Sequence, residues 1–412
     1  MAQPMLDGYR ALDLTDEKGF LCGKILADLG VDVIKVERPG GDPARRLGPF
    51  YHDIPDPEKS LLWFAYNAGK RGITLNIETA DGQEIFRRLV EKADFVIESF
   101  PPGYLDNLRL GYDDLNRINP RIIMTSITPF GQTGPYKDYK VSDLICMAMG
   151  GLMYICGDPD RPPVRFSVEQ AYAHGATQAA AGTLIAHYHR ERTGEGQHVD
   201  VSIVESIIWT LCYSIPYWDL NKVILPRTGN RQKRAKYSVR FFFPCKDGYV
   251  AYRIGTGNLF GPWQIRLVEA MNEEGLGEDL KDVDWMGIDI DGIPQWDLDR
   301  WEEIVGEYFQ RHTKAELHEM ALERNINLFP VNNMGDILRY QQLHDRDYWV
   351  KLEHPELGVS LTYPGAFFKS SEVSCEARCR APLIGEHNLE VYEKELGLTR
   401  KELVCLKEAG VI

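Results

Sequence analysis

The chain has 412 residues, enough for about two domains and a large buried core. Apolar residues make up 44% of the chain and charged residues 26%, proportions that are ordinary for a soluble globular protein. The formal net charge of −14 argues against nucleic acid as the general partner, although it allows a local basic pocket for a phosphorylated ligand.

The sequence carries no membrane or metal signal. No apolar run approaches the ~20 residues of a membrane span, and the N-terminal MAQPMLDGYR lacks the charged-then-apolar pattern of a signal peptide. The eight cysteines are scattered and do not have the spacing of a secreted disulfide framework. Cys375 and Cys379 form one close pair, but no second pair completes a zinc set. We therefore expect a reduced, cytoplasmic protein without a metal.

The first third of the chain alternates expected strands and helices, assigned from buried β-branched runs and helical apolar spacing. In chain order they are a strand at 10–14, a helix at 19–29, a strand at 31–37, a strand at 72–77, a helix at 80–92, a strand at 95–99 and a strand at 121–127. This alternation predicts an α/β fold with a doubly wound, Rossmann-like parallel sheet. Such sheets bind ligands at the carboxyl ends of their strands, where Arg38, Ser99 and Phe100 fall.

A long Ala-rich helix is expected after the Pro-rich turn at 159–163. It should be broken at 193–196, Thr-Gly-Glu-Gly, because glycine commonly follows the last helical residue. A short strand at 198–201 comes next, and Ser202 is placed to cap another helix, just as Thr79 is placed to cap the helix at 80–92.

The character of the sequence changes after Trp218. A basic run follows, with Arg227, Arg231, Lys233, Arg234 and Lys236, and then strands at 237–244 and 248–254 and an acidic, Trp-rich stretch at 272–303. The basic run is either a solvated linker face or a set of cations that binds an anion from a partner chain. We expect a large domain from 1–220, a small domain at 225–330, and a C-terminal return to the large domain at 331–412.

Six blocks of sequence, in a fixed order, span most of the chain. They are VDVIKVERPGGDPAR (31–45), GKRGITLNI (69–77), KADFVIESFPPGYLDNLRLGYDDL (92–115), PFGQTGPYKDYKVSDL (129–144), RTGEGQHVDVS (192–202) and PLIGEHNLEVYEKELGL (382–398). Together they resemble the class III (CaiB/BaiF-type) CoA-transferases. The resemblance implies a large and a small α/β domain and an interlocked dimer, in which each chain threads the other.

The resemblance also implies the chemistry. In that family a carboxylate attacks an acyl-CoA thioester, and CoA is then passed to an acceptor acid. The substrates are therefore a CoA thioester and a carboxylic acid, with no metal. Arg38 and Lys140 match residues suited to coenzyme A, together with Ser99 and Phe100 at the strand ends. The family's phosphate-binding arginine is replaced by Asn107, and the histidine of the racemase branch is absent from the matching stretch at 141–143.

The family's nucleophilic aspartate belongs near the start of the Ala-rich helix. The corresponding register holds Gln170, Ala171 and Tyr172, none of which is an acid. Glu169 is the nearest carboxylate: it is either a surrogate nucleophile or a helix-start glutamate that interacts favourably with the helix dipole. His174, one turn further on, is either a neutral packing residue or a substrate contact.

These departures predict a subunit that lacks its own nucleophile and completes a heterodimer with a homologous, aspartate-bearing subunit. Among family members, the chain resembles those that move CoA from succinyl-CoA to an aryl-substituted dicarboxylate such as (R)-2-benzylsuccinate, in anaerobic toluene degradation. Two alternatives stay open. One is a self-sufficient homodimeric transferase that uses Glu169, and the other is a non-enzymatic CoA-binding scaffold.

Overall fold

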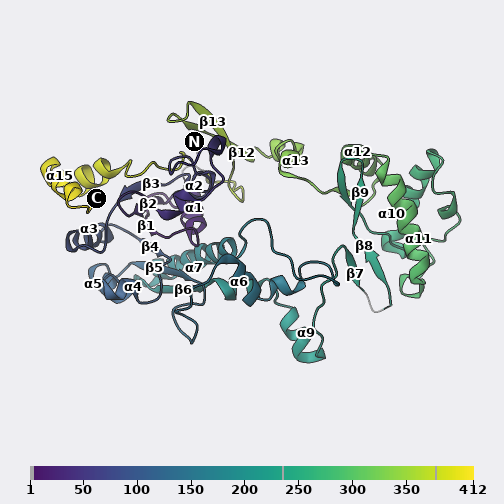
Figure 1. Ribbon diagram of the computed structural model, residues 1–412, viewed down its shortest axis with the longest axis horizontal. Helices are drawn as coiled ribbons and strands as arrows, with labels where there is room; N and C mark the ends of the chain where they lie inside the picture. The colour runs from purple at the N-terminus through teal and green to yellow at the C-terminus, as the bar shows by residue number, and fades with distance from the viewer. Residues whose placement is uncertain (1–3, 234–235, 376–377) are drawn as a thin grey trace. The chain divides into compact units, whose positions relative to one another are not determined.

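The computed structural model describes residues 4–233, 236–375 and 378–412. It divides into two compact units, which are described separately here (Figure 1). Unit 1 contains the chain up to Met153, Arg165–Val223 and Leu343–Ile412, and unit 2 contains Tyr154–Val164 and Ile224–Gln342. The chain therefore leaves unit 1 and returns to it.

Unit 1 is built on a six-stranded sheet with the order β3-β2-β1-β4-β5-β6 (Figure 1). Its strands are β1 (Arg10–Leu14), β2 (Asp32–Glu37), β3 (Arg71–Thr74), β4 (Phe95–Glu98), β5 (Ile123–Thr128) and β6 (His198–Ser202). Every pairing between these strands is parallel. This strand order is that of the doubly wound nucleotide-binding folds, so the predicted Rossmann-like sheet is confirmed.

Helices cover both faces of this sheet, because successive strand residues point to opposite sides. One face shares a core with α1 (Phe20–Asp28), α6 (Asp143–Met149), α7 (Ala171–Thr193) and α8 (Ile203–Trp209). The other shares a core with α3 (Ala80–Val90), α4 (Tyr104–Asn107), α5 (Tyr112–Ile118), the π-helix Leu389–Glu395 and α15 (Arg400–Glu408). A smaller cluster joins α2 (Leu61–Asn67) to the hairpin of β12 (Trp349–His354) and β13 (Val359–Pro364).

Local sequence determines where several of these helices begin and end. The Thr79 hydroxyl accepts the Gly82 N–H at the start of α3, and the Ser202 hydroxyl accepts the Glu205 N–H at the start of α8. Helix α7 ends at Gly194, whose φ of 83° lies in the left-handed region that favours glycine. The predicted caps and the predicted end of the Ala-rich helix are therefore confirmed.

A buried ionic cluster lies inside unit 1. Lys70 Nζ is 2.8 Å from Asp13 Oδ2, and Lys35 Nζ is 3.5 Å from Asp13 Oδ1, with all three side chains fully buried. Lys70 also donates to the Phe20 carbonyl and to Asn67 Oδ1. Burial alone would raise the pKa of Asp13, but Lys35 and Lys70 outweigh it and bring that pKa down to about 2. Burial lowers the pKa of Lys70 to about 8.

Unit 2 is a smaller α/β body. Its elements are an antiparallel sheet of β9 (Phe242–Cys245), β10 (Gly248–Ala251) and β11 (Phe329–Pro330), a pair of strands β7 (Arg231–Lys233) and β8 (Ser238–Arg240), and the helices α10 (Gly257–Glu273), α11 (Gln295–Gln310) and α12 (Lys314–Arg324). The strand expected at 237–244 is divided between two pairings at Phe241. The Phe241 N–H donates to the Asn230 carbonyl, in register with β7 and β8, and the Phe241 carbonyl accepts the Tyr252 N–H, in register with β9 and β10. Trp285 and Trp301 are buried with their rings edge to face, so the Trp-rich stretch supplies core.

Two arginines of the basic run make hydrogen bonds and ion pairs within unit 2. Arg227 donates to the carbonyl oxygens of Tyr154 and Asp158, and Arg231 forms ion pairs with Asp299 and Glu302. Arg234 lies outside the described residues. Among the described parts of the chain, no helix combines the length and the apolar character that crossing a membrane requires.

Candidate active site

A cavity of about 440 Å³ lies where β1, β2, β3 and β4 end, and we call it the strand-end cavity. Its lining includes Arg38, Asp42, Asn76, Ser99, Phe100 and Tyr104. Three of the four residues that the sequence analysis connected with coenzyme A therefore meet at one cavity. The fourth, Lys140, is exposed and is not part of this lining.

The wall of the strand-end cavity beyond β4 is held by hydrogen bonds and ring stacking. The Ser99 hydroxyl donates to Asp16 Oδ1 at 2.8 Å and accepts the Asp16 N–H at 2.9 Å. The rings of Phe100 and Tyr104 stack with centroids 4.6 Å apart, and the Tyr104 hydroxyl donates to Glu78. An aromatic pair and an arginine at one cavity suit a ligand that has a planar base and phosphates.

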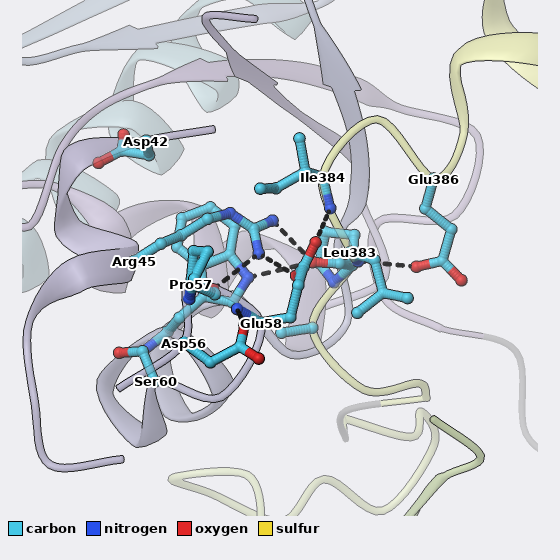
Figure 2. A network of polar contacts seen from close by, with 12 residues as sticks. Asp42, Arg45, Asp56, Pro57, Glu58, Ser60, Leu383, Ile384 and Glu386 are labelled. Carbon is cyan, nitrogen blue, oxygen red and sulfur yellow. Dashed lines mark hydrogen bonds and ion pairs between the residues drawn. The ribbon is translucent and has the colours of Figure 1, made fainter. Parts of the chain in front are cut away.

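A buried arginine fixes the opposite wall, the loop after β2 (Figure 2). The fully buried Arg45 guanidinium binds Glu37 through two bonds, of 2.6 Å to Oε2 and 2.8 Å to Oε1. Glu37 Oε2 also accepts the Asp42 N–H at 2.8 Å. Glu37, Arg38 and Asp42 all line the strand-end cavity, so Arg45 holds part of its wall from behind.

The same arginine anchors a segment that is more than 300 residues away in the chain. Arg45 Nη2 donates to the Pro382 carbonyl at 2.9 Å, and Nη1 binds Glu58 at 2.7 Å. Figure 2 shows the second oxygen of Glu58 bonded to the Ile384 N–H, at 2.9 Å. Gly41 has a φ of 90°, and a Cβ there would lie 2.8 Å from the Ile384 side chain, so any other residue would be strained at this position. The 382–386 segment thus braces the cavity loop.

The start of α7 is where the resemblance locates the nucleophile. Gln170 is the residue before the helix, Ala171 and Tyr172 are buried in its first turn, and none of them supplies a carboxylate. The carboxylate that reaches this helix start is Asp143 of α6, whose Oδ1 accepts the Tyr172 N–H at 3.0 Å. His174 is half-buried further along α7. The contact of Asp143 could not be predicted from local sequence, because the Tyr172 N–H that it accepts lies 29 residues away on another helix.

Glu169 lies before the helix, is exposed, and lines a second cavity of about 320 Å³, the helix-start cavity. Glu17, Asp143 and Arg165 share this lining with apolar side chains. Partial desolvation at the cavity and the nearby Asp143 raise the pKa of Glu169, and burial and Asp16 raise the pKa of Glu17. Three carboxylates against one guanidinium make this cavity an unfavourable environment for a carboxylate acceptor.

The remaining predicted residues lie away from these cavities. Asn107 is exposed at the end of α4 and does not line the strand-end cavity, and Arg109, two residues on, is exposed with a φ of 56°. Cys375 and Cys379 are free thiols. Among the described residues, no group of three or more His, Cys, Asp or Glu side chains is arranged to hold a metal ion.

Known proteins resemble this chain along nearly all of its length. Residues 6–388 match the family described as CoA-transferase family III. Succinyl-CoA:(R)-benzylsuccinate CoA-transferase subunit BbsE of Thauera aromatica is 37% identical, over 98% of this chain and 97% of that protein. Succinyl-CoA--D-citramalate CoA-transferase of Chloroflexus aurantiacus is 32% identical, over 99% of this chain and 98% of that protein.

A solved structure agrees with these sequence matches. The crystal structure of a CAIB/BAIF family protein from Brucella suis superimposes with a TM-score of 0.82 at 29% identity, covering 96% of this chain and all of that one. The resemblance inferred from the six sequence blocks is therefore confirmed. This chain belongs to CoA-transferase family III and is a CoA-transferase by family.

Proposed function

We propose that this chain is the subunit without a nucleophile in a heterodimeric CoA-transferase. A homologous subunit supplies the catalytic aspartate, and the two chains interlock as the family resemblance implies. The start of α7 carries this proposal, because the register of the expected aspartate holds Gln170, Ala171 and Tyr172. The 37% identity to a protein that is itself described as a subunit supports it.

The reaction moves CoA from succinyl-CoA to an aryl-substituted dicarboxylate such as (R)-2-benzylsuccinate. The partner's aspartate attacks the thioester carbon, which releases the CoA thiolate and leaves a mixed anhydride. The thiolate then attacks the aspartyl carbonyl, succinate leaves, and a CoA thioester remains on the enzyme. The acceptor carboxylate then attacks the aspartyl carbonyl, which releases the CoA thiolate and leaves a second mixed anhydride. The thiolate attacks the acceptor's carbonyl in that anhydride, which gives the product thioester and frees the aspartate. This chain has no carboxylate in that register to carry these intermediates.

In this proposal the strand-end cavity binds the nucleotide end of CoA. Arg38→Ala is then expected to weaken CoA binding by about 10- to 100-fold, the range for a lost charge-assisted hydrogen bond. Isothermal titration of the purified chain with CoA measures the effect. Arg117→Ala removes the same charge from an exposed position on α5 and should leave the affinity unchanged. An equal loss in both variants would contradict a specific phosphate contact.

A surface for the partner runs over the end of α8 and over α9 (Ser214–Asn221). Large apolar side chains are exposed there, including Trp209 at 68% and Leu220 at 78%, together with Tyr213, Ile215 and Trp218. Groups of exposed aromatic and large aliphatic side chains are typical of protein interfaces. We assign this surface to the homologous subunit.

Trp209→Ala should weaken the heterodimer by about 30-fold or more, because a buried tryptophan anchor contributes about 2 kcal/mol or more to an interface. Analytical ultracentrifugation of the mixed subunits measures the dissociation constant. Leu322→Ala, which truncates an exposed leucine on α12, is the matched control. Unchanged association of the Trp209 variant would assign the partner to a different surface.

Turnover of succinyl-CoA and benzylsuccinate tests the proposed function. We expect activity only after this chain is mixed with its aspartate-bearing partner, and we expect Glu169→Ala and Asp143→Asn to leave that activity within about twofold, since neither side chain reacts. Turnover by this chain alone, lost in Glu169→Ala, would instead establish the self-sufficient homodimer. CoA binding without turnover in any mixture would establish the scaffold.

A further inference from the structure

Glu98 is a buried carboxylate directly behind the strand-end cavity. It is the last residue of β4, is only 4% exposed, and precedes Ser99 and Phe100 of the cavity wall. Its Oε2 accepts the Phe100 N–H at 2.6 Å. Because Phe100 stacks on Tyr104, this one bond helps to hold the aromatic pair that the cavity presents to a ligand.

Neighbouring side chains connect Glu98 to the edge of the sheet. Glu98 and Ser126 are opposite each other in the register of β4 and β5, and the Ser126 hydroxyl acts to lower the pKa of Glu98. Ser126 Oγ is also 2.8 Å from Nε2 of His198, on the outermost strand β6. The His198 ring stacks on Tyr112. A buried acid, a hydroxyl and an imidazole thus form one chain of contacts across three strands.

This chain of contacts opens on a cavity separate from the strand-end cavity. Glu98, Ser126 and His198 all line a space of about 300 Å³, the edge cavity, which also contains Asp106, Asp113, Gln132 and Lys137. The Gln132 side-chain nitrogen is buried without a hydrogen-bond partner. Solvent and protons therefore have a route to Glu98 that does not pass through the strand-end cavity.

We propose that Glu98 is a positioning residue for CoA binding, and that its ionisation governs how firmly Phe100 is held in the wall of the strand-end cavity. The inference rests on the proposed binding of CoA in that cavity. An ionised carboxylate accepts a stronger hydrogen bond from a backbone N–H than a neutral carboxyl does. CoA therefore binds more tightly to the form in which Glu98 is charged.

The groups around Glu98 set the pH range of this effect. Burial raises the pKa of Glu98 to about 7, Asp16 and Asp106 act in the same direction, and the Ser126 hydroxyl and the bond from Phe100 oppose them. Burial lowers the pKa of His198, so this imidazole is largely neutral when Glu98 titrates. Both forms of Glu98 are then present near neutral pH, and a ligand that prefers the charged form releases protons as it binds.

The test measures binding of dephospho-CoA by isothermal titration, because the 3′-phosphate of CoA itself titrates near pH 6. Between about pH 8 and pH 6 the affinity of the unmodified chain should fall by about tenfold, the size expected when a hydrogen bond to a charged group loses that charge. Titrations in two buffers with different ionisation enthalpies should show proton release near pH 7. Glu98→Gln retains an acceptor for the Phe100 N–H but cannot titrate. The affinity of this variant for dephospho-CoA should therefore not change with pH, and its binding should release no protons.

A control variant separates this role from a merely structural one. Asp113→Asn removes an acid from the same edge cavity without touching Phe100, and it should keep the pH profile of the unmodified chain. If Glu98→Gln does not fold, proton release by the unmodified chain alone tests whether ligand binding is coupled to the ionisation of Glu98. Identical pH profiles for Glu98→Gln and the unmodified chain, or no proton release, would overturn the inference. No binding of dephospho-CoA at any pH would overturn the proposed nucleotide site itself.

Discussion

Asp13→Asn should lower the free energy of unfolding by about 3–5 kcal/mol, which is the cost of breaking a buried ion pair by removing one partner. Among the residues that the structure describes, Asp13 is the carboxylate that pairs with the buried ammonium groups of both Lys35 and Lys70. Asparagine has the same shape but no charge, so both ammonium groups would remain buried without compensation. Chemical denaturation followed by circular dichroism measures the loss.

The pH dependence provides a second readout for Asp13. Its pKa is lowered from 3.8 to about 2 in the folded chain, so its contribution to stability is present above about pH 4 and is lost as the pH falls through about 2. The gap between the unmodified chain and Asp13→Asn should narrow by about 2.5 kcal/mol over that range. Asp138→Asn, at a side chain 72% exposed, should change stability by no more than about 0.5 kcal/mol. Equal effects of the two substitutions would contradict the buried cluster.

Arg45→Met should lower the free energy of unfolding by a similar amount, about 3–5 kcal/mol. It leaves the buried Glu37 carboxylate without the guanidinium that donates two hydrogen bonds to it. It also removes the hydrogen bonds to the Pro382 carbonyl and to Glu58, so the 382–386 segment is held less firmly against the cavity loop. Since Glu37 and Asp42 line the strand-end cavity, CoA binding should weaken together with stability.

The neighbouring arginine gives a matched control for this prediction. Arg46 is exposed, and Arg46→Met should stay within about 0.5 kcal/mol of the unmodified chain. A double-mutant cycle of Arg45→Met with Glu37→Gln isolates the pair. A coupling energy near zero would show that Arg45 stabilises the chain through packing on Trp63, 3.8 Å from its guanidinium, and not through Glu37.

Much of the fold of unit 1 could be predicted because its signals are local. Buried β-branched runs identify the strands, and Thr79, Ser202 and Gly194 mark helix ends through bonds and angles within a few residues. The rule that parallel strands end at one edge brought Arg38, Ser99 and Phe100 to the same cavity without any knowledge of their contacts.

The parts that the sequence did not reveal depend on long-range pairing. Arg45 and Pro382 are 337 residues apart, and no periodicity links them. Asp143 was passed over because its role comes from the Tyr172 N–H of another helix. In the sequence, Glu98 cannot be distinguished from any other buried strand residue. The register of β4, β5 and β6 shows that it lies opposite Ser126, which contacts His198. In unit 2, a run that has strand character throughout changes partner at Phe241, which bonds to Asn230 on one side and to Tyr252 on the other.

The most direct test of the central claim asks which chain carries the covalent CoA thioester. The mixed subunits are incubated with succinyl-CoA, quenched in acid and separated, and the intact mass of each chain is measured. The account predicts a CoA adduct on the aspartate-bearing partner and none on this chain, with or without Glu169→Ala. A CoA adduct on this chain, mapped to Glu169 or Asp143, would contradict the proposal that it lacks a nucleophile.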